Sequence, residues 1–126
     1  MGNPFSVIAD KKKNRLLIDL NDIDIEHIDK IIEDIWDKAL KLKVGWGCIV
    51  NYAKVDIPLT LELREKIGTA MSFLKQLGMG QIVRVFREDQ SSFQDELKKL
   101  GMEIGGYEGI EARTVQDANT VLDLIR

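Results

Sequence analysis

The residues that could do chemistry are few, and they do not form a catalytic set. His27 is the only histidine and Cys48 the only cysteine in the 126-residue chain. A catalytic thiol needs a base that activates it, and a metal centre needs several ligands at short spacing; neither requirement is met around these two residues. We therefore interpret Cys48, which lies in an apolar run, as a core residue, and His27 as a surface or packing residue.

An aspartate that accepts a phosphoryl group is a further possibility. Such a site needs an acidic pair after an early strand, an aspartate at the end of the central strand and a lysine after the last strand. Asp56 lies several residues beyond the expected strand end, and the last expected strand is followed by Thr114-Val115-Gln116, without a lysine. The sequence also lacks a glycine-rich phosphate loop, a nucleophile elbow and the spacing of metal ligands. We predict that the protein is not an enzyme and uses no cofactor.

The segment 48–60 is the best candidate for a binding site. Its first five residues predict a buried strand, and a polar loop then leads into a helix that we expect to begin near Pro58. In open α/β sheets, ligands and partners meet the carboxyl ends of the strands. We expect Asp56 to cap the helix. Three loops should cluster at this edge of the sheet: 21–24, 51–60 and 87–90.

Length and composition indicate one globular domain, residues 1–126. Hydrophobic residues make up 44% and charged residues 31% of the chain, as in soluble globular proteins. The net charge of -3 lacks the basic excess of proteins that bind nucleic acid. No apolar run approaches the roughly 20 residues that span a bilayer, the N-terminus lacks a secretory signal, and a lone cysteine favours a reducing compartment. We expect a cytoplasmic protein with no nucleic-acid partner and no membrane insertion.

Hydrophobic periodicity predicts the element order β-β-α-β-α-β-α-β-α. Strands are expected at 5–9, 15–20, 48–52, 81–87 and 110–114, and helices at 25–40, 59–77, 91–100 and 114–125. This alternation implies an α/β fold with a mostly parallel five-stranded sheet, in which the first strand is antiparallel at one edge. Capping boxes are expected at the last two helices, formed by Ser91 and Ser92 with Gln94 and Asp95, and by Thr114 with Asp117.

Polar residues inside the strands indicate that the two faces of the sheet differ. A parallel sheet that is covered on both faces reads as nearly continuous apolar runs. Four of the expected strands instead contain polar residues, namely Asp19, Asn51, Arg84, Glu111 and Arg113. We infer that the helices stack mainly on one face, and that the other face is partly open or covered by a partner. A homodimer is one way to cover it.

The layout resembles the sulfate transporter and anti-sigma factor antagonist domain, abbreviated STAS. The resemblance runs from Phe5 to Ile125, and the whole chain is interpreted as a single STAS-like domain. It rests on the order of elements and on three stretches: 15–20 with the acidic turn that follows, Val55-Asp56 before the second helix, and 114–122. The resemblance implies a non-catalytic domain of regulation or signalling that binds a protein partner, such as a regulatory kinase or an anti-sigma factor.

The sequence departs from the family at its functional position. In regulatory members an aspartate is followed at once by a serine or threonine, which a partner kinase phosphorylates. Asp56 matches the aspartate, but Ile57 and Pro58 stand where the hydroxyl residue and its neighbour belong. Isoleucine cannot carry a phosphate, and proline lacks an N–H donor. Thr60 is the only nearby hydroxyl and is out of register for this role, so we expect the domain to lack the phosphorylatable residue.

Two functions follow as hypotheses. The first is partner binding through the loops at the carboxyl ends of the strands, by Asp22, Asp24, Tyr52, Lys54, Asp56, Ile57, Pro58 and Thr60. The alternative is a small-molecule or lipid-binding domain of related fold. In that case the apolar loop 57–59 would rim a pocket together with Trp46 and Tyr52.

Overall fold

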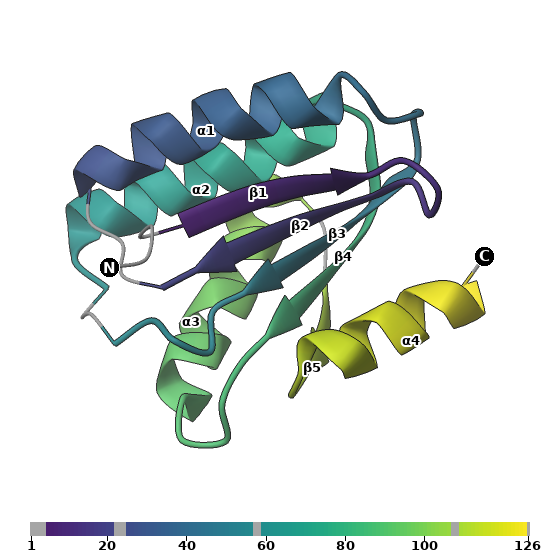
Figure 1. The fold of residues 1–126 in the computed structure, drawn as a ribbon. Helices are drawn as coiled ribbons and strands as arrows, with labels where there is room; N and C mark the ends of the chain where they lie inside the picture. The colour runs from purple at the N-terminus through teal and green to yellow at the C-terminus, as the bar shows by residue number, and fades with distance from the viewer. Residues whose placement is uncertain (1–4, 22–24, 57–58, 107–108, 126) are drawn as a thin grey trace.

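Strands and helices alternate along the chain in the predicted order (Figure 1). The computed structural model describes residues 5–21, 25–56, 59–106 and 109–125. Its elements are β1 (Phe5–Asp10), β2 (Arg15–Leu20), α1 (Ile25–Ala39), β3 (Trp46–Asn51), α2 (Leu61–Gln76), β4 (Met79–Val85), α3 (Ser91–Leu100), the short π-helical turn η1 (Gly101–Gly105), β5 (Ile110–Ala112) and α4 (Val115–Ile125). The α/β fold class and the order of elements are confirmed.

The described strands form one mixed sheet in the order β1-β2-β3-β4-β5. β1 pairs with β2 in the antiparallel direction, with Val7 opposite Ile18, whereas the other three pairs are parallel. The first strand is therefore the antiparallel strand at one edge, as predicted.

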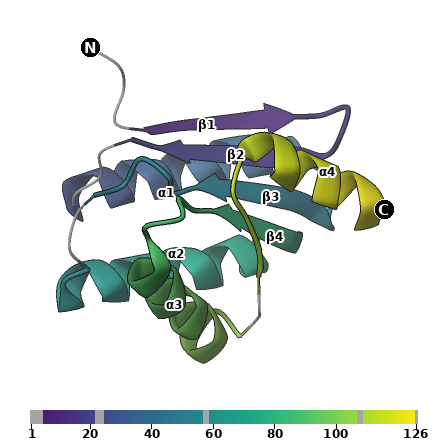
Figure 2. The same ribbon diagram turned by 90° about the horizontal axis from the view of Figure 1, so that it is seen from below.

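Three helices cover one face of the sheet, and α4 lies on the other (Figure 2). Strands β2 to β5 lie side by side in chain order. Because parallel crossovers are right-handed, each of the connecting helices α1, α2 and α3 is placed on the same face. α4 follows the last strand and connects to no further described strand, so the crossover rule does not determine the face on which it lies. The prediction that the helices lie mainly on one face is confirmed.

The alternation of side chains along the strands divides the core into two clusters. Leu16 and Ile18 of β2 belong to the larger cluster, beneath α1, α2 and α3, and Leu17 between them packs on the other face. The smaller cluster, between the sheet and α4, is made by Ile49, Val83, Val85, Ala118 and Leu122.

A buried arginine fixes α4 on its face of the sheet. Arg15 begins β2 and is only 4% exposed. Its guanidinium donates to Asn119 Oδ1 at 2.9 Å and to Asp123 Oδ1 at 2.5 Å, both on α4. A guanidinium can satisfy several acceptors at once, which makes it suitable for joining a strand to a helix without leaving a charge unpaired.

Several local predictions are wrong. β3 begins at Trp46 instead of Cys48, and β5 ends at Ala112 instead of Thr114. α2 begins at Leu61 instead of near Pro58, because Thr60 is the N-cap and its Oγ1 accepts a hydrogen bond from Leu63 N. β4 begins at Met79 and ends at Val85, two residues earlier than expected. The N-cap of α3 is Gln90, and it makes no side-chain capping bond, so the expected capping box is absent there. At α4, in contrast, Thr114 Oγ1 accepts from Asp117 N at 3.0 Å, as predicted.

The polar strand residues do not all lie on the more open face. Asp19 and Asn51 are paired neighbours on β2 and β3 and lie on the α4 side. Arg84 lies on the opposite face, which the three helices cover, between the core residues Ile82 and Phe86. It is 0% exposed, so its predicted position on the open face is wrong. Beyond α4 the second face is partly open, since Ile8 of β1 is 54% exposed there.

Candidate functional site

The loops that follow β3 and β4 meet at the carboxyl ends of the strands, as predicted. We call this region, residues 51–56 and 86–90 with Arg113, the carboxyl edge. Strand hydrogen bonding continues into it: Tyr52 N donates to Val85 O at 2.9 Å, and Phe86 N donates to Ala112 O at 3.0 Å. The two loops are therefore held side by side by the sheet itself.

A buried glutamine joins the two loops. The Nε2 group of Gln90 donates to Tyr52 O at 3.0 Å and to Val55 O at 2.9 Å, while its Oε1 accepts from Arg87 N at 2.6 Å. Gln90 is 6% exposed, so these three bonds are shielded from water. A buried amide whose donors and acceptor are all used this way fixes a single loop conformation.

Arg87 makes a second set of bonds at the surface of the carboxyl edge. Its guanidinium donates to Ala53 O and to Asp56 Oδ1, each at 2.6 Å, and to Asp89 Oδ1 at 2.9 Å. The carboxylates remain open to solvent, with 75% of the Asp56 side chain and 76% of the Asp89 side chain exposed. Arg113 donates in turn to Arg87 O at 2.9 Å. The result is an ordered, charged surface.

The ion pairs shift two pKa values. The hydrogen bond that Arg87 donates to Asp56, followed by the one that it donates to Asp89, raises the pKa of Arg87 above its ordinary value. The same guanidinium lowers the pKa of Asp89, chiefly through the hydrogen bond and then through its charge. Both carboxylates face solvent, which screens these effects. The ion pairs of Arg87 therefore set the local geometry and contribute little to the stability of the fold.

A polar pair supports the edge from the α4 side. Asn51 Nδ2 donates to Asp19 Oδ1 at 3.0 Å, and Asn51 Oδ1 accepts from Ala53 N at 3.0 Å. The side chain thus connects the end of β2 to the turn that follows β3.

The structure brings together part of the predicted site. Lys54 and Asp56 are exposed on the loop, and Thr60 is exposed at the start of α2. Tyr52 is 5% exposed. Its ring stacks on Phe86 with 5.3 Å between ring centroids, so it supports the loop from the core. The remaining candidates, Asp22, Asp24, Ile57 and Pro58, lie outside the described residues.

The expected capping role of Asp56 is wrong. Thr60 occupies that position, and Asp56 instead binds Arg87. Sequence reasoning also missed Gln90, Arg87 and Asp89 as structural parts of the site. The loop 87–90 was expected at this edge, but a single sequence has no signal that distinguishes a buried loop glutamine from an exposed one.

The thiol of Cys48 lies in the core, as expected. The residue is 0% exposed, and burial raises the pKa of its thiol to about 12, which the charge of Arg84 only partly offsets. The thiolate, which is the reactive form, is therefore strongly disfavoured. Within the described ranges, no group of three or more His, Cys, Asp or Glu side chains is placed to hold a metal ion. None of the described helices is long and apolar enough to cross a membrane.

A small apolar cavity lies between the sheet and the two helices α1 and α2. Its volume is about 50 Å³. Tyr52 lines it, but Trp46 does not. Trp46 begins β3 and Tyr52 follows the end of that strand, so these two rings lie at opposite ends of β3. The expected pocket rim containing both is wrong.

Comparisons with known proteins do not assign the chain to a family. No protein-family model matches it, and no curated protein matches it significantly.

Proposed function

We propose that the protein is a non-catalytic interaction domain of a regulatory or signalling system, which binds a protein partner through the carboxyl edge. The observation that carries this proposal is the bonding of Gln90, which fixes the loop 52–56 from beneath. The charged groups of Lys54, Asp56 and Asp89 remain exposed above it.

An ordered charged loop suits recognition for a physical reason. A binding surface that is already fixed loses less conformational entropy when a partner docks. Exposed charges on such a surface select a complementary partner and steer its approach. The carboxyl edge combines both properties, because its backbone is bonded to Gln90 and its carboxylates are held by Arg87.

The resemblance to STAS domains gives this proposal its regulatory context. The sequence has Ile57 where the family's phosphorylated hydroxyl belongs. Thr60, the nearest hydroxyl, serves as the cap of α2. We therefore propose recognition that does not depend on phosphorylation of this loop, with a regulatory kinase or an anti-sigma factor as the class of partner.

Site-specific photo-crosslinking tests the proposal. A photoreactive residue in place of Lys54 should crosslink a partner in cells that contain the protein. The same residue in place of Lys12, which is exposed in the hairpin at the other end of β2, should not. Equal crosslinking from both positions, or from Lys12 alone, would contradict the proposed surface.

The apolar cavity favours a second candidate function, the binding of a small apolar molecule. Its volume of about 50 Å³ holds only a small group, so an acyl chain would have to separate α1 from α2. A ligand that binds only the folded state raises the melting temperature. A thermal-shift screen with fatty acids and nucleotides should show such a rise if this candidate is correct. An unchanged melting temperature with every compound would exclude this function.

A further inference from the structure

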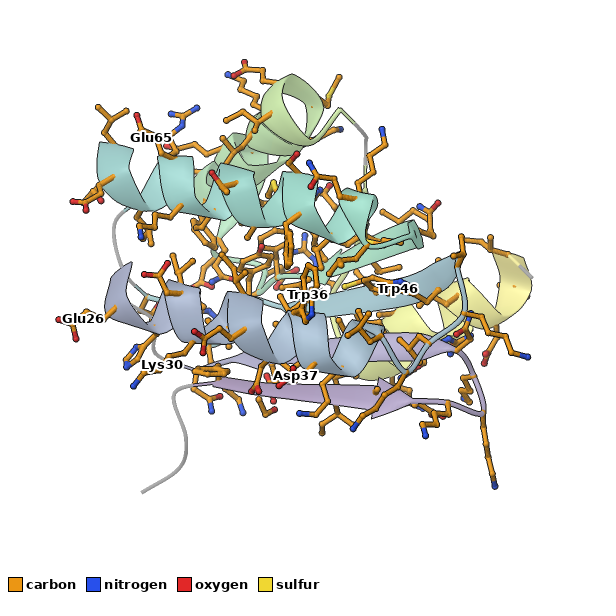
Figure 3. All side chains as sticks on the ribbon, turned by 90° about the horizontal axis from the view of Figure 1, so that it is seen from above. Glu26, Lys30, Trp36, Asp37, Trp46 and Glu65 are labelled. Atoms are coloured by element: carbon orange, nitrogen blue, oxygen red, sulfur yellow. The ribbon has the colours of Figure 1, made fainter. Side chains whose placement is uncertain are left out.

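A partly exposed aromatic pair lies on the outer side of the helical layer, away from the carboxyl edge. Trp36 of α1 stacks on Phe73 of α2, with ring centroids 5.7 Å apart and an angle of 15° between the planes. Trp36 is 48% exposed. Figure 3 shows it in the space between the two helices. The two rings belong to an open hollow of about 380 Å³, which we call the Trp36 hollow, lined by Ile32, Glu33, Trp36, Asp37 and Phe73.

The other tryptophan of the chain is buried, in contrast to Trp36. Trp46 is 0% exposed, and its indole N–H donates to Leu77 O at 3.3 Å. Phe73 stacks nearly parallel to one face of the Trp36 indole, and 48% of the residue is exposed, from which we infer that the other face is open. An open aromatic face of this kind attracts a cation through the negative potential of its π system.

Two carboxylates beside the indole add negative charge. Glu33 and Asp37 are one helical turn apart and both line the Trp36 hollow. In the parts of the chain that the structure describes, neither has a hydrogen-bond or ion-pair partner. Their neighbours on α1 differ, since Asp29 pairs with Lys66 at 3.1 Å and Asp34 pairs with Lys38 at 3.8 Å. Like charges at this helical spacing repel, and a cation between them would remove that repulsion.

We propose that the Trp36 hollow is a docking site for an arginine side chain carried by a basic segment of a protein partner. The guanidinium lies against the open face of Trp36 and donates to the carboxylates of Glu33 and Asp37. This site is separate from the carboxyl edge, and the two proposals can fail independently.

Arginine fits the hollow better than other groups. Its guanidinium is planar and weakly hydrated, so it stacks on an indole and keeps N–H donors for two carboxylates. The ammonium of lysine is a strongly hydrated point charge and gains less from stacking. Tryptophan and arginine are also the residues that most often carry the energy of protein interfaces. The two carboxylates would repel an anionic lipid surface or a nucleic acid.

Tryptophan fluorescence tests the proposal with defined probes. The main probe is a synthetic peptide of three Arg-Ser-Gly repeats, and the controls carry citrulline or lysine in place of arginine. We expect the arginine peptide to change the emission of the wild-type protein in a saturable way, and the citrulline peptide to have no effect. The lysine peptide should bind at least threefold more weakly.

Variants locate the binding. Trp36→Phe should abolish the emission change while the signal of buried Trp46 persists. The double variant Glu33→Gln and Asp37→Asn should weaken binding of the arginine peptide at least fivefold. A matched control, Asp95→Asn with Glu111→Gln, also removes two exposed carboxylates and should bind like the wild type.

Three results would overturn the proposal. One is equal binding of the arginine and citrulline peptides. Another is unchanged binding in the Glu33→Gln and Asp37→Asn variant, or an equal loss in the matched control. The last is a change in Trp36 emission with protein concentration alone, accompanied by dimers in sedimentation, which would assign the hollow to a second copy of the chain.

Discussion

The carboxyl edge and the Trp36 hollow present charge in opposite ways. At the carboxyl edge the carboxylates of Asp56 and Asp89 are already bonded to Arg87. In the Trp36 hollow the carboxylates of Glu33 and Asp37 have no partner within the described residues. The edge is thus ordered before any partner arrives, whereas the hollow gains a counter-charge only from outside. Under the two proposals, the carboxyl edge would select its partner through fixed shape, and the Trp36 hollow through its unpaired carboxylates.

The energies of the two regions should differ accordingly. The bonds of Gln90 are buried, so losing them leaves backbone groups without water or protein partners. The ion pairs of Arg87 are exposed and screened. The stacking of Trp36 is half open to solvent. Variants in the two regions should therefore separate a stability effect beneath the edge from a small effect in the hollow.

The largest expected effect concerns the core on which both regions rest. Burial holds the thiol pKa of Cys48 at about 12 against an ordinary 9.0. The thiolate fraction at pH 8 should therefore be about a thousandfold lower than in the unfolded chain. We expect a thiol reagent to modify Cys48 only after denaturation, and rapid modification of the native protein would contradict the buried position.

The same shift predicts a loss of stability in alkali. A raised pKa stabilises the fold fully below the unfolded value and loses this stabilisation as pH rises toward the folded value. Between about pH 10 and pH 12 the free energy of unfolding should fall as pH rises, by roughly 1 kcal/mol per pH unit from Cys48 alone. Tyr52, whose pKa burial also raises to about 12, adds to the slope. Urea denaturation at several pH values measures how steeply the free energy of unfolding falls with pH, and Cys48→Ala should make this slope smaller.

Gln90→Leu should sharpen the comparison between the two regions. It leaves Tyr52 O, Val55 O and Arg87 N without their bonds, and we expect the free energy of unfolding to fall by about 2–3 kcal/mol. Gln94→Leu is the matched control, because Gln94 lies one helical turn further along, inside α3, and is only partly buried. It should change stability by less than about 0.5 kcal/mol. Equal effects in urea denaturation would mean that Gln90 does not hold the edge.

The two tryptophans allow a direct comparison of a core position with the hollow. Trp46→Phe removes a buried indole and leaves Leu77 O without its donor, so the expected loss is about 2 kcal/mol. Trp36→Phe keeps an aromatic ring on Phe73 at an exposed site and should cost less than about 0.5 kcal/mol. Thermal or urea unfolding measures both. A larger loss for Trp36 would indicate that its role is structural and that the hollow is not a free surface.

The smallest expected effect is at the carboxyl edge. Arg87 lowers the pKa of Asp89. The contribution of this ion pair to stability is therefore present above the ordinary pKa of an aspartate and is lost as pH falls through the lowered value. In an NMR titration of the carboxyl carbon, Arg87→Leu should raise the pKa of Asp89 toward the ordinary range. Arg64→Leu on α2 removes a positive charge elsewhere and should leave the pKa of Asp89 at its lowered value. If both variants behave alike, the pair seen at the edge does not persist in solution.

Much of the fold could be predicted because hydrophobic spacing reports which face of each element is buried. The sequence predicts the mixed sheet and the antiparallel edge strand for this reason. It does not reveal that α4 covers the second face, since the apolar stripe of a helix does not say which side of the sheet it meets. Arg84 was misplaced for a related reason: a charged residue in a strand normally indicates an exposed position, and only the packed structure shows its burial.

The site was predicted less well than the fold. Both Asp56 and Thr60 are good capping residues a few positions apart, and spacing alone does not decide between them. The role of Gln90 depends on contacts more than thirty residues away along the chain. Such long-range bonds leave no local pattern. That the loops after β3 and β4 lie side by side was nevertheless predicted correctly, because loops after parallel strands meet at one edge whatever their individual bonds.

The most direct test of the central claim is the affinity of a crosslinked and purified partner for two charge-reversal variants. Asp56→Arg changes the carboxyl edge, and Asp95→Arg makes the same change on the exposed surface of α3. Titration calorimetry with both folded variants should show at least tenfold weaker binding for Asp56→Arg and binding within twofold of the wild type for Asp95→Arg. Wild-type affinity in the Asp56→Arg variant would contradict partner recognition through the carboxyl edge.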